Sequence, residues 1–311
     1  MKIAWLFPGQ GSQEVGMGRA LFEASPAARE VFESADRALG RSISRICFEG
    51  PVTDLTLTEN TQPALVATSS AILAALRERY PSLPAPVFAA GHSLGEYSAL
   101  VAAGALSLQD AVRLVELRGR AMQSAVPEGK GAMVAVVGGD REAVLALCEE
   151  AKSAGVVEPA NFNAPGQVVL SGEADAVAKV SALAAERSLK AIPLKVSAPF
   201  HCSLMTPAAE AVARALETIE VRPAAFPIIA NASASPNQEP SQTKRLLVEQ
   251  IAGPVRWDQS ISHMAEAGVT HALEIGPQKV LANLVKRIDK RIRVLSLSDP
   301  DALAKVSEFL G

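Results

Sequence analysis

Short apolar segments alternate with longer segments of helical periodicity along most of the chain. The continuous apolar runs at Ile3 to Phe7 and Val87 to Ala90 predict strands that are buried on both faces. Apolar residues recur at helical spacing in Ala64 to Arg79 and in Leu108 to Ala125, and Pro63 suits the first turn of the former helix. This alternation of strands and helices predicts an α/β fold with a parallel sheet.

The pattern changes between Gly131 and Ser197. This segment predicts a strand, a helix, two strands joined by a turn at Ala164 to Gly166, a second helix, and a last strand at Ala191 to Val196. The order βαββαβ is that of a ferredoxin-like unit. We therefore expect a self-contained unit that is inserted into the larger fold.

Chain-breaking residues flank the inserted unit, since Pro127 to Gly131 precede it and Ser197 to Pro199 follow it. Beyond them the alternation of helices and strands resumes. We therefore expect a small ferredoxin-like subdomain of residues 128–197. Residues 1–127 and 198–311 would together form the large α/β domain.

The composition narrows the function classes. The 311 residues are 49% hydrophobic and only 4% aromatic, and their formal net charge is −3. Nucleic-acid binding is not expected, because it depends on basic and aromatic surfaces that this composition does not supply. No stretch approaches the roughly 18 apolar residues of a membrane span. The chain has an odd number of cysteines without C-x-x-C spacing: Cys47, Cys148 and Cys202. We therefore expect neither a disulfide framework nor a zinc site, and we expect a cytoplasmic location.

A glycine-rich segment, Gly9 to Gly16, follows the first predicted strand and invites comparison with phosphate-binding loops. It lacks the third glycine of the dinucleotide-binding fingerprint, and Met17 stands where a P-loop requires lysine. Nucleotide binding by either motif is therefore not expected. A tight turn explains the glycines, but Gln10, whose amide both donates and accepts hydrogen bonds, stays a candidate site residue.

A G-x-S-x-G motif occupies Gly91 to Gly95, directly after a predicted strand and before a helical segment. This context is that of a nucleophile elbow, a sharp turn that holds a serine side chain clear of the sheet. Ser93 is therefore a candidate nucleophile, and the backbone N–H of Leu94 is a candidate oxyanion donor. The structural alternative is that Ser93 caps the helix.

A serine nucleophile requires a base, and the chain has four histidines. His92 is adjacent to the serine, where neighbouring side chains diverge; His263 lies in an amphipathic helix; and His271 precedes a predicted strand. His201 lies in a loop at the expected crossing between the two domains, where functional residues concentrate. We therefore favour His201 over a histidine that only packs and forms hydrogen bonds.

Helical spacing turns Arg118 inward, because its neighbours three and four residues away are all apolar: Leu114, Val115, Ala121 and Met122. A guanidinium cannot lose its charge, so a buried one requires an anionic partner, and its planar fork suits a carboxylate. The structural alternatives to ligand binding are an internal salt bridge and a side chain that extends its charged end to the surface.

Several blocks of this sequence resemble the malonyl-CoA:acyl carrier protein transacylases of type II fatty-acid synthesis and the related acyltransferase domains of polyketide synthases. The resemblance spans essentially the whole chain and implies a hydrolase-like α/β domain with an inserted ferredoxin-like subdomain and an active site in the cleft between them. The blocks are Phe7 to Gln13, Thr61 to Ala64, Gly91 to Glu96, Arg118 to Met122, Asn161 to Gln167, Pro199 to His201, Pro254 to Trp257 and Glu274 to Pro277.

The resemblance also implies roles for individual residues. Ser93 looks like the nucleophile that becomes malonylated, and His201 like its general base and later acid. Gln250 resembles the residue whose backbone carbonyl orients the imidazole, in place of the acid of a catalytic triad. In ordinary α/β-hydrolases that acid lies between the serine and the histidine in the sequence, but here the acidic residues after Lys130 belong to the inserted unit. A pair of Ser93 and His201 held by a carbonyl needs no acid.

Substrate binding follows in the same way. Leu94 and Gln10 resemble the two oxyanion donors through their backbone N–H groups, and Arg118 would hold the free carboxylate of the malonyl group. Phe200 matches the pattern of malonyl-selective relatives, because a bulky ring there leaves little room for a 2-methyl group. This preference is modest, since a single methylene discriminates by only about 1 to 3 kcal/mol.

The implied activity is transfer of malonyl from malonyl-CoA to the phosphopantetheine thiol of acyl carrier protein, without a metal or other cofactor. A stand-alone acyltransferase of a polyketide synthase is the alternative. The carrier proteins of such systems are acidic, so a chain of net charge −3 needs a local basic patch to attract one. The candidate basic residues form two groups: Arg187 with Lys190, and Lys286, Arg287, Lys290, Arg291 and Arg293.

Overall fold

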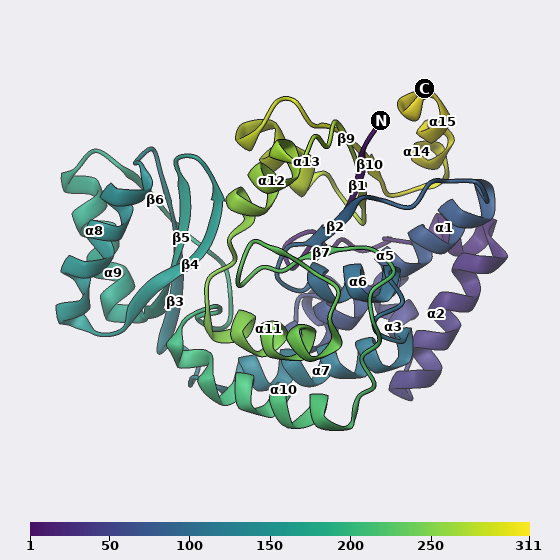
Figure 1. The fold of residues 1–311 in the computed structure, drawn as a ribbon. Helices are drawn as coiled ribbons and strands as arrows, with labels where there is room; N and C mark the ends of the chain where they lie inside the picture. The colour runs from purple at the N-terminus through teal and green to yellow at the C-terminus, as the bar shows by residue number, and fades with distance from the viewer.

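Two β-sheets organise the 311 residues, all of which the computed structural model describes (Figure 1). The larger sheet has the strand order β10-β9-β1-β2-β7-β8, and every neighbouring pair is parallel except β7 with β8. Its strands are β1 (Ile3–Phe7), β2 (Phe88–Gly91), β7 (Ile228–Ile229), β8 (Pro236–Asn237), β9 (His271–Ile275) and β10 (Arg293–Leu297).

Helices cover both faces of this sheet, which explains the continuous apolar runs of its strands. Ile3, Trp5 and Phe7 of β1 belong to the main core, whereas Ala4 and Leu6 belong to a second core on the opposite face. The main core is built with α1 (Arg19–Ala24), α2 (Pro26–Leu39), α3 (Ile43–Glu49), α4 (Val52–Leu55), α5 (Thr58–Arg79), α6 (Gly95–Ala102), α7 (Leu108–Ser124), α10 (Thr206–Thr218), α11 (Pro240–Ala252), α14 (Pro300–Ala304) and α15 (Val306–Leu310). The second core is built with α12 (Trp257–Glu266) and α13 (Val280–Ile288).

The smaller sheet is antiparallel, in the order β4-β5-β3-β6. Helices α8 (Arg141–Ala151) and α9 (Ala174–Glu186) cover one of its faces and enclose a separate hydrophobic core. The strands are β3 (Gly131–Val137), β4 (Val157–Ala164), β5 (Gln167–Glu173) and β6 (Lys190–Pro193), and the unit lies at the left of Figure 1. This architecture confirms the predicted α/β fold with an inserted ferredoxin-like subdomain, whereas the boundaries at 128 and 197 stay predictions.

Backbone hydrogen bonds attach the smaller sheet to the large domain. The N–H of Val255, just before α12, donates to the carbonyl of Ala160 in β4 at 2.8 Å, and the N–H of Phe162 donates to the carbonyl of Val255 at 2.9 Å. Arg141 of α8 adds an ion pair with Asp258 of α12 at 2.6 Å. The two units are thereby held on either side of a cleft.

Two predicted boundaries were wrong. Helix α5 begins at Thr58 rather than at Ala64, so Pro63 is an interior residue and not part of the first turn. The added turns carry buried polar side chains such as Thr61 and Gln62, which interrupt the apolar periodicity. At the other boundary, β6 ends at Pro193, and the chain from Leu194 to Val196 leaves the sheet and lines the cleft.

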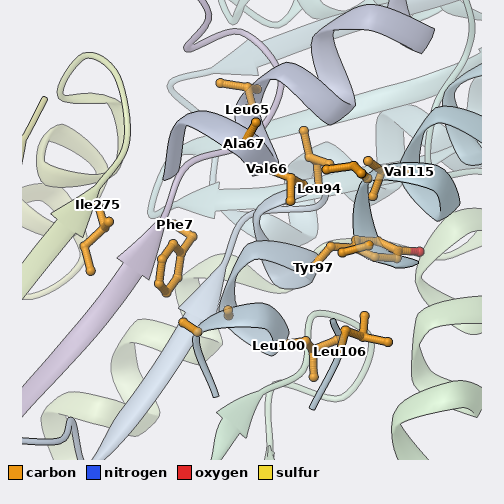
Figure 2. Close-up of a cluster of buried hydrophobic side chains, with 14 of the residues drawn as sticks. Phe7, Leu65, Val66, Ala67, Leu94, Tyr97, Leu100, Leu106, Val115 and Ile275 are labelled. Carbon is orange, nitrogen blue, oxygen red and sulfur yellow. The ribbon is translucent and has the colours of Figure 1, made fainter. Parts of the chain in front are cut away.

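None of the helices is long and apolar enough to cross a membrane. The longest helix, α5, instead lies within the main core, where Leu65, Val66 and Ala67 approach Phe7 of β1 and Leu94 before α6 (Figure 2).

The junction of β1, β2 and α6 is the tightest point of the large domain. A Cβ atom added to Gly91 would lie 1.8 Å from the backbone carbon of Gly95, and one added to Gly95 would lie 2.0 Å from the carbonyl oxygen of Phe7. Only hydrogen fits at these two positions. The strand and the helix can therefore pass so closely that the intervening residues, His92 to Leu94, make a sharp turn at the end of the sheet.

We expect Gly95→Ala to lower the free energy of unfolding by more than about 3 kcal/mol, because the added methyl group meets backbone atoms that cannot move separately. Denaturant titration measures the loss. Gly104→Ala is the matched control: Gly104 has a φ of +70° but no atom within 4 Å of the added carbon. It should lose only about 1 kcal/mol, from backbone strain. Equal losses for the two variants would contradict the steric argument.

Candidate functional site

Ser93 stands at the apex of the turn between β2 and α6. Its φ of 48° lies in the left-handed region, which lifts the side chain away from the sheet. The side chain of Ser93 does not cap α6, because the helix begins at Gly95 and its N-terminus has no side-chain hydrogen bond. The capping alternative is therefore wrong.

Ser93 and His201 form a hydrogen-bonded pair. The Oγ atom of Ser93 lies 2.7 Å from Nε2 of His201, and Nδ1 of His201 lies 2.8 Å from the carbonyl oxygen of Gln250. A carbonyl oxygen only accepts, so Nδ1 carries the proton and Nε2 of a neutral ring is free to accept from the serine. Burial, followed by the positive charge of Arg118, lowers the pKa of His201 to about 3, and the imidazole is neutral at neutral pH.

The other three histidines form no hydrogen bond with the Ser93 hydroxyl and make contacts of their own. His92 shares a hydrogen bond of 2.8 Å with the side chain of Asn163. His263 packs edge-on against Phe88, and His271 packs in the same way against Phe309. His201 is thus the histidine that the structure brings to Ser93, as the loop position suggested.

Arg118 of α7 is 1% exposed, as its helical spacing predicts. Its Nη1 atom donates to Oε1 of Gln62 at 2.9 Å, and its Nη2 atom donates to Oε1 of Gln250 at 3.0 Å and to Oγ of Ser93 at 3.1 Å. The ring of Tyr97 lies 5.5 Å from the guanidinium carbon. No carboxylate forms an ion pair with Arg118, so the alternative of an internal salt bridge is wrong.

The guanidinium still has donor capacity for a ligand. Its Nε–H group is buried and has no partner in the chain, although a buried donor without a partner is costly. Arg118 also lines a cavity of about 120 Å³ that reaches Ser93 and His201. A cation at this place can bind a carboxylate that is attached to the group reacting at Ser93.

The cavity lies between the two units of the fold. Met133 and Asn161 line it from the smaller sheet, and Leu194 and Val196 line it from the returning chain. The remaining lining residues, from the large domain and its loops, are Gln10, Gln62, His92, Ser93, Leu94, Arg118, Met122, Phe200 and His201. Gln10, Leu194 and Val196 also line an adjoining outer cavity of about 720 Å³, so the inner cavity has a route to the surface.

Leu94 and Gln10 both line the inner cavity. Neither residue belongs to a helix or strand, and neither backbone N–H donates to another group of the chain. Phe200, which is also buried, lines the same cavity beside His201. The structure therefore gathers all seven predicted site residues at one place: Gln10, Ser93, Leu94, Arg118, Phe200, His201 and Gln250.

Sequence reasoning missed Asn231, which fixes the backbone of the turn. Its Oδ1 atom accepts from the N–H of Ser93 at 2.7 Å, and its Nδ2 atom donates to the carbonyl of Gly91 at 2.7 Å. The available signal was a polar residue two positions after the apolar strand β7, which pairs with β2. In a parallel sheet this places Asn231 beside the end of β2.

Glu96 was also missed as a site residue, although it belongs to the motif block around Ser93. Its Oε2 atom accepts from Nε2 of Gln250 at 2.8 Å and from the N–H of Asn231 at 3.0 Å. Burial raises the pKa of Glu96 to about 7, although the hydrogen bonds from Asn231 and Gln250 act in the opposite direction.

Nowhere does the chain bring together three or more His, Cys, Asp or Glu residues in an arrangement that could hold a metal ion.

Comparison with known proteins agrees with this geometry. The chain matches the acyl transferase domain family over residues 4–304. It is 49% identical to the malonyl CoA-acyl carrier protein transacylase of Bacillus subtilis over 304 residues, which cover 97% of this chain and 95% of the relative.

Solved structures of malonyltransferases also superpose closely on this chain. The acyl-carrier-protein S-malonyltransferase of Bartonella henselae superposes with a TM-score of 0.97 at 45% identity, with full coverage of both chains. A malonyl-transacylase solved in complex with a type II PKS acyl-carrier protein superposes with a TM-score of 0.96 at 42% identity, with 99% coverage of each chain. The turn that exposes Ser93, its pairing with a buried histidine and these full-length matches lead to one conclusion: the chain belongs to the acyl transferase domain family.

Proposed function

We propose that this acyltransferase moves the malonyl group from malonyl-CoA to the phosphopantetheine thiol of acyl carrier protein and so supplies fatty-acid synthesis. One observation carries the proposal: Oγ of Ser93 lies 2.7 Å from Nε2 of His201 and 3.1 Å from Nη2 of Arg118. A nucleophile, a neutral base and a cation for a free carboxylate thus meet at one atom. The Bacillus subtilis relative is named for the same transfer.

The first half-reaction forms a malonyl-serine. Oγ of Ser93 attacks the thioester carbonyl while its proton passes to Nε2 of His201. The backbone N–H groups of Leu94 and Gln10 stabilise the tetrahedral oxyanion. The carbon–sulfur bond then breaks, His201 returns the proton to the sulfur, and CoA leaves as a thiol.

The second half-reaction reverses these roles. The phosphopantetheine thiol gives its proton to His201 and attacks the malonyl-serine, and the serine oxygen recovers the proton as it leaves. The two half-reactions give ping-pong kinetics. Since each step is an addition, an elimination or a proton transfer, the proposed reaction uses no metal ion and no redox cofactor.

Arg118 selects the acyl group in this proposal. Its guanidinium binds the free carboxylate of malonyl, and it also orients the acyl group toward Ser93. Phe200 restricts the space beside His201 and so disfavours a branched acyl group, by about 1 to 3 kcal/mol per methylene. The outer cavity leads the thioester arm of either substrate to the reacting atoms.

A polyketide carrier is the second candidate acceptor, and the solved complex of a related transacylase with a type II PKS acyl-carrier protein favours it. The chemistry at Ser93 is the same for both acceptors. We also infer a cytoplasmic location, because Cys47, Cys148 and Cys202 are all unpaired and buried, as suits a reducing compartment.

The covalent intermediate is directly testable. After incubation with malonyl-CoA, Ser93→Ala should show no malonyl adduct by intact-mass spectrometry, while His201→Ala should slow both adduct formation and discharge to carrier protein by about 10²- to 10⁴-fold. Ser98→Ala is the matched control, because Ser98 is buried in α6 and its hydroxyl has no partner. A stable adduct on Ser93→Ala, or normal acylation of His201→Ala, would contradict the mechanism.

Arg118→Ala should reduce malonyl transfer far more than acetyl transfer. Loss of one partner of a buried charge pair costs roughly 2 to 5 kcal/mol, which is about 30-fold to a few thousand-fold in kcat/KM. Acetyl has no carboxylate to leave unpaired, so its transfer should change little or rise. The measurement is the ratio of kcat/KM for malonyl-CoA and acetyl-CoA. If kcat/KM falls by the same factor for malonyl-CoA and acetyl-CoA, Arg118 has only a structural role.

The carrier should dock on cations that are free of intramolecular ion pairs. Arg187 pairs with Glu150 and Arg291 pairs with Asp289, whereas Lys286 is exposed and unpaired. Lys286→Glu should raise the apparent KM for carrier protein about tenfold and leave that for malonyl-CoA unchanged. Lys305→Glu, at an exposed position near the C-terminus, is the control. An unchanged KM for the carrier would place docking elsewhere.

A further inference from the structure

Glu96 is a buried acidic residue that the transfer mechanism does not use. It lies in the first turn of α6, is 3% exposed, and forms no ion pair. An ionised carboxylate in such a place is destabilising unless hydrogen bonds compensate it. Its hydrogen-bond partners are the side chain of Gln250 and the backbone of Asn231, and both of these residues also bond to Ser93.

The side-chain amide of Gln250 connects Glu96 to Arg118. Its Nε2 atom donates to Oε2 of Glu96 at 2.8 Å and to the carbonyl of Ser93 at 2.9 Å, so both amide hydrogens are used. Its Oε1 atom accepts from Nη2 of Arg118 at 3.0 Å. A flipped amide would direct its NH₂ group at the guanidinium and its oxygen at the carboxylate, which are both repulsive contacts. Glu96 and the Ser93 carbonyl therefore together fix which end of the amide faces Arg118, and above its pKa of about 7 the Glu96 carboxylate strengthens this preference with a negative charge.

We propose that Glu96 is a positioning residue for malonyl recognition: through the Gln250 amide it holds the Arg118 guanidinium against Ser93, oriented to receive the malonyl carboxylate. The inference rests on the proposed malonyl transfer and adds a residue to its selectivity. Arg118 has no direct contact with a carboxylate. The Gln250 amide links it to the negative charge of Glu96, which compensates the guanidinium indirectly. The site for the substrate carboxylate stays open as a result.

Glu96 acts in this proposal on recognition more than on the chemical step. His201 is oriented by the backbone carbonyl of Gln250, whose place is set by the backbone of α11 and not by the side-chain amide. Removing the charge of Glu96 therefore leaves the pair of Ser93 and His201 in place. The orientation of Arg118 is what loosens, and only an acyl group with a carboxylate depends on it.

The test is the ratio of kcat/KM for malonyl-CoA and acetyl-CoA in Glu96→Gln, measured at pH 8 with the intact enzyme. We expect the malonyl-to-acetyl ratio to fall about tenfold, since a hydrogen bond to an ionised group is roughly twice as strong as a neutral one. Glu274→Gln is the matched control. Glu274 is also buried, one residue before the end of β9, and it accepts from the N–H groups of Leu281 and Ala282. Its substitution should change stability but leave the ratio unchanged.

Two further variants separate the possible failures. In an Arg118→Ala background, Glu96→Gln should not change the ratio again, because both residues act through one contact. If Arg118→Ala alone leaves the ratio unchanged, malonyl recognition by Arg118 fails. If Arg118→Ala changes the ratio but Glu96→Gln behaves like Glu274→Gln, only the positioning role fails.

A third variant covers the case in which Glu96→Gln does not fold. Gln250→Met keeps the backbone carbonyl that orients His201 and removes the amide between Glu96 and Arg118. The positioning role requires the same roughly tenfold fall in the malonyl-to-acetyl ratio. An unchanged ratio in a folded Gln250→Met enzyme overturns the proposal.

Discussion

The site depends on the close passage of α6 over the ends of β1 and β2, where Gly91 and Gly95 leave no space for a Cβ atom. This steric constraint forces the turn in which Ser93 adopts a left-handed conformation. The strain is held by hydrogen bonds from outside the turn, since Asn231 accepts from the N–H of Ser93 and Gln250 donates to its carbonyl. A strained residue persists where its surroundings fix it from several directions, and these bonds serve that purpose.

The two units of the fold have different tasks. The large domain carries the groups that react, and its rigid sheet fixes their spacing. The smaller sheet contributes Met133 and Asn161 to the cavity wall, and the return of the chain contributes Leu194 and Val196. A wall that is largely apolar lowers the local dielectric constant and strengthens the hydrogen bonds at Ser93. Such enclosure also favours a thiol acceptor over water during discharge of the acyl-enzyme.

Burial of charge shapes the chemistry of the cavity. His201 is neutral because it is desolvated near a cation, so its Nε2 atom is unprotonated and available to accept the proton of Ser93. Arg118 keeps its charge because amide oxygens, the serine hydroxyl and the ring of Tyr97 surround it without neutralising it. A buried cation with no carboxylate of its own is a preorganised receptor for an anionic acyl group. Selectivity thus comes from the same network that holds the nucleophile.

The sequence by itself determined what depends on local spacing. Alternating apolar runs gave the α/β class, the G-x-S-x-G turn gave Ser93, and helical spacing gave the inward direction of Arg118, because strand and helix periodicity fix which side a residue faces. Only the tertiary structure showed which other polar side chains hold the turn of Ser93 and the guanidinium of Arg118. Asn231 reaches the turn from the end of a neighbouring strand, and Glu96 contacts Asn231 from within α6. The buried polar residues at the start of α5 concealed the first turns of that helix, which carry Gln62. These contacts bring together residues far apart in the chain, and a polar side chain shows its partner only when the packed fold has placed both.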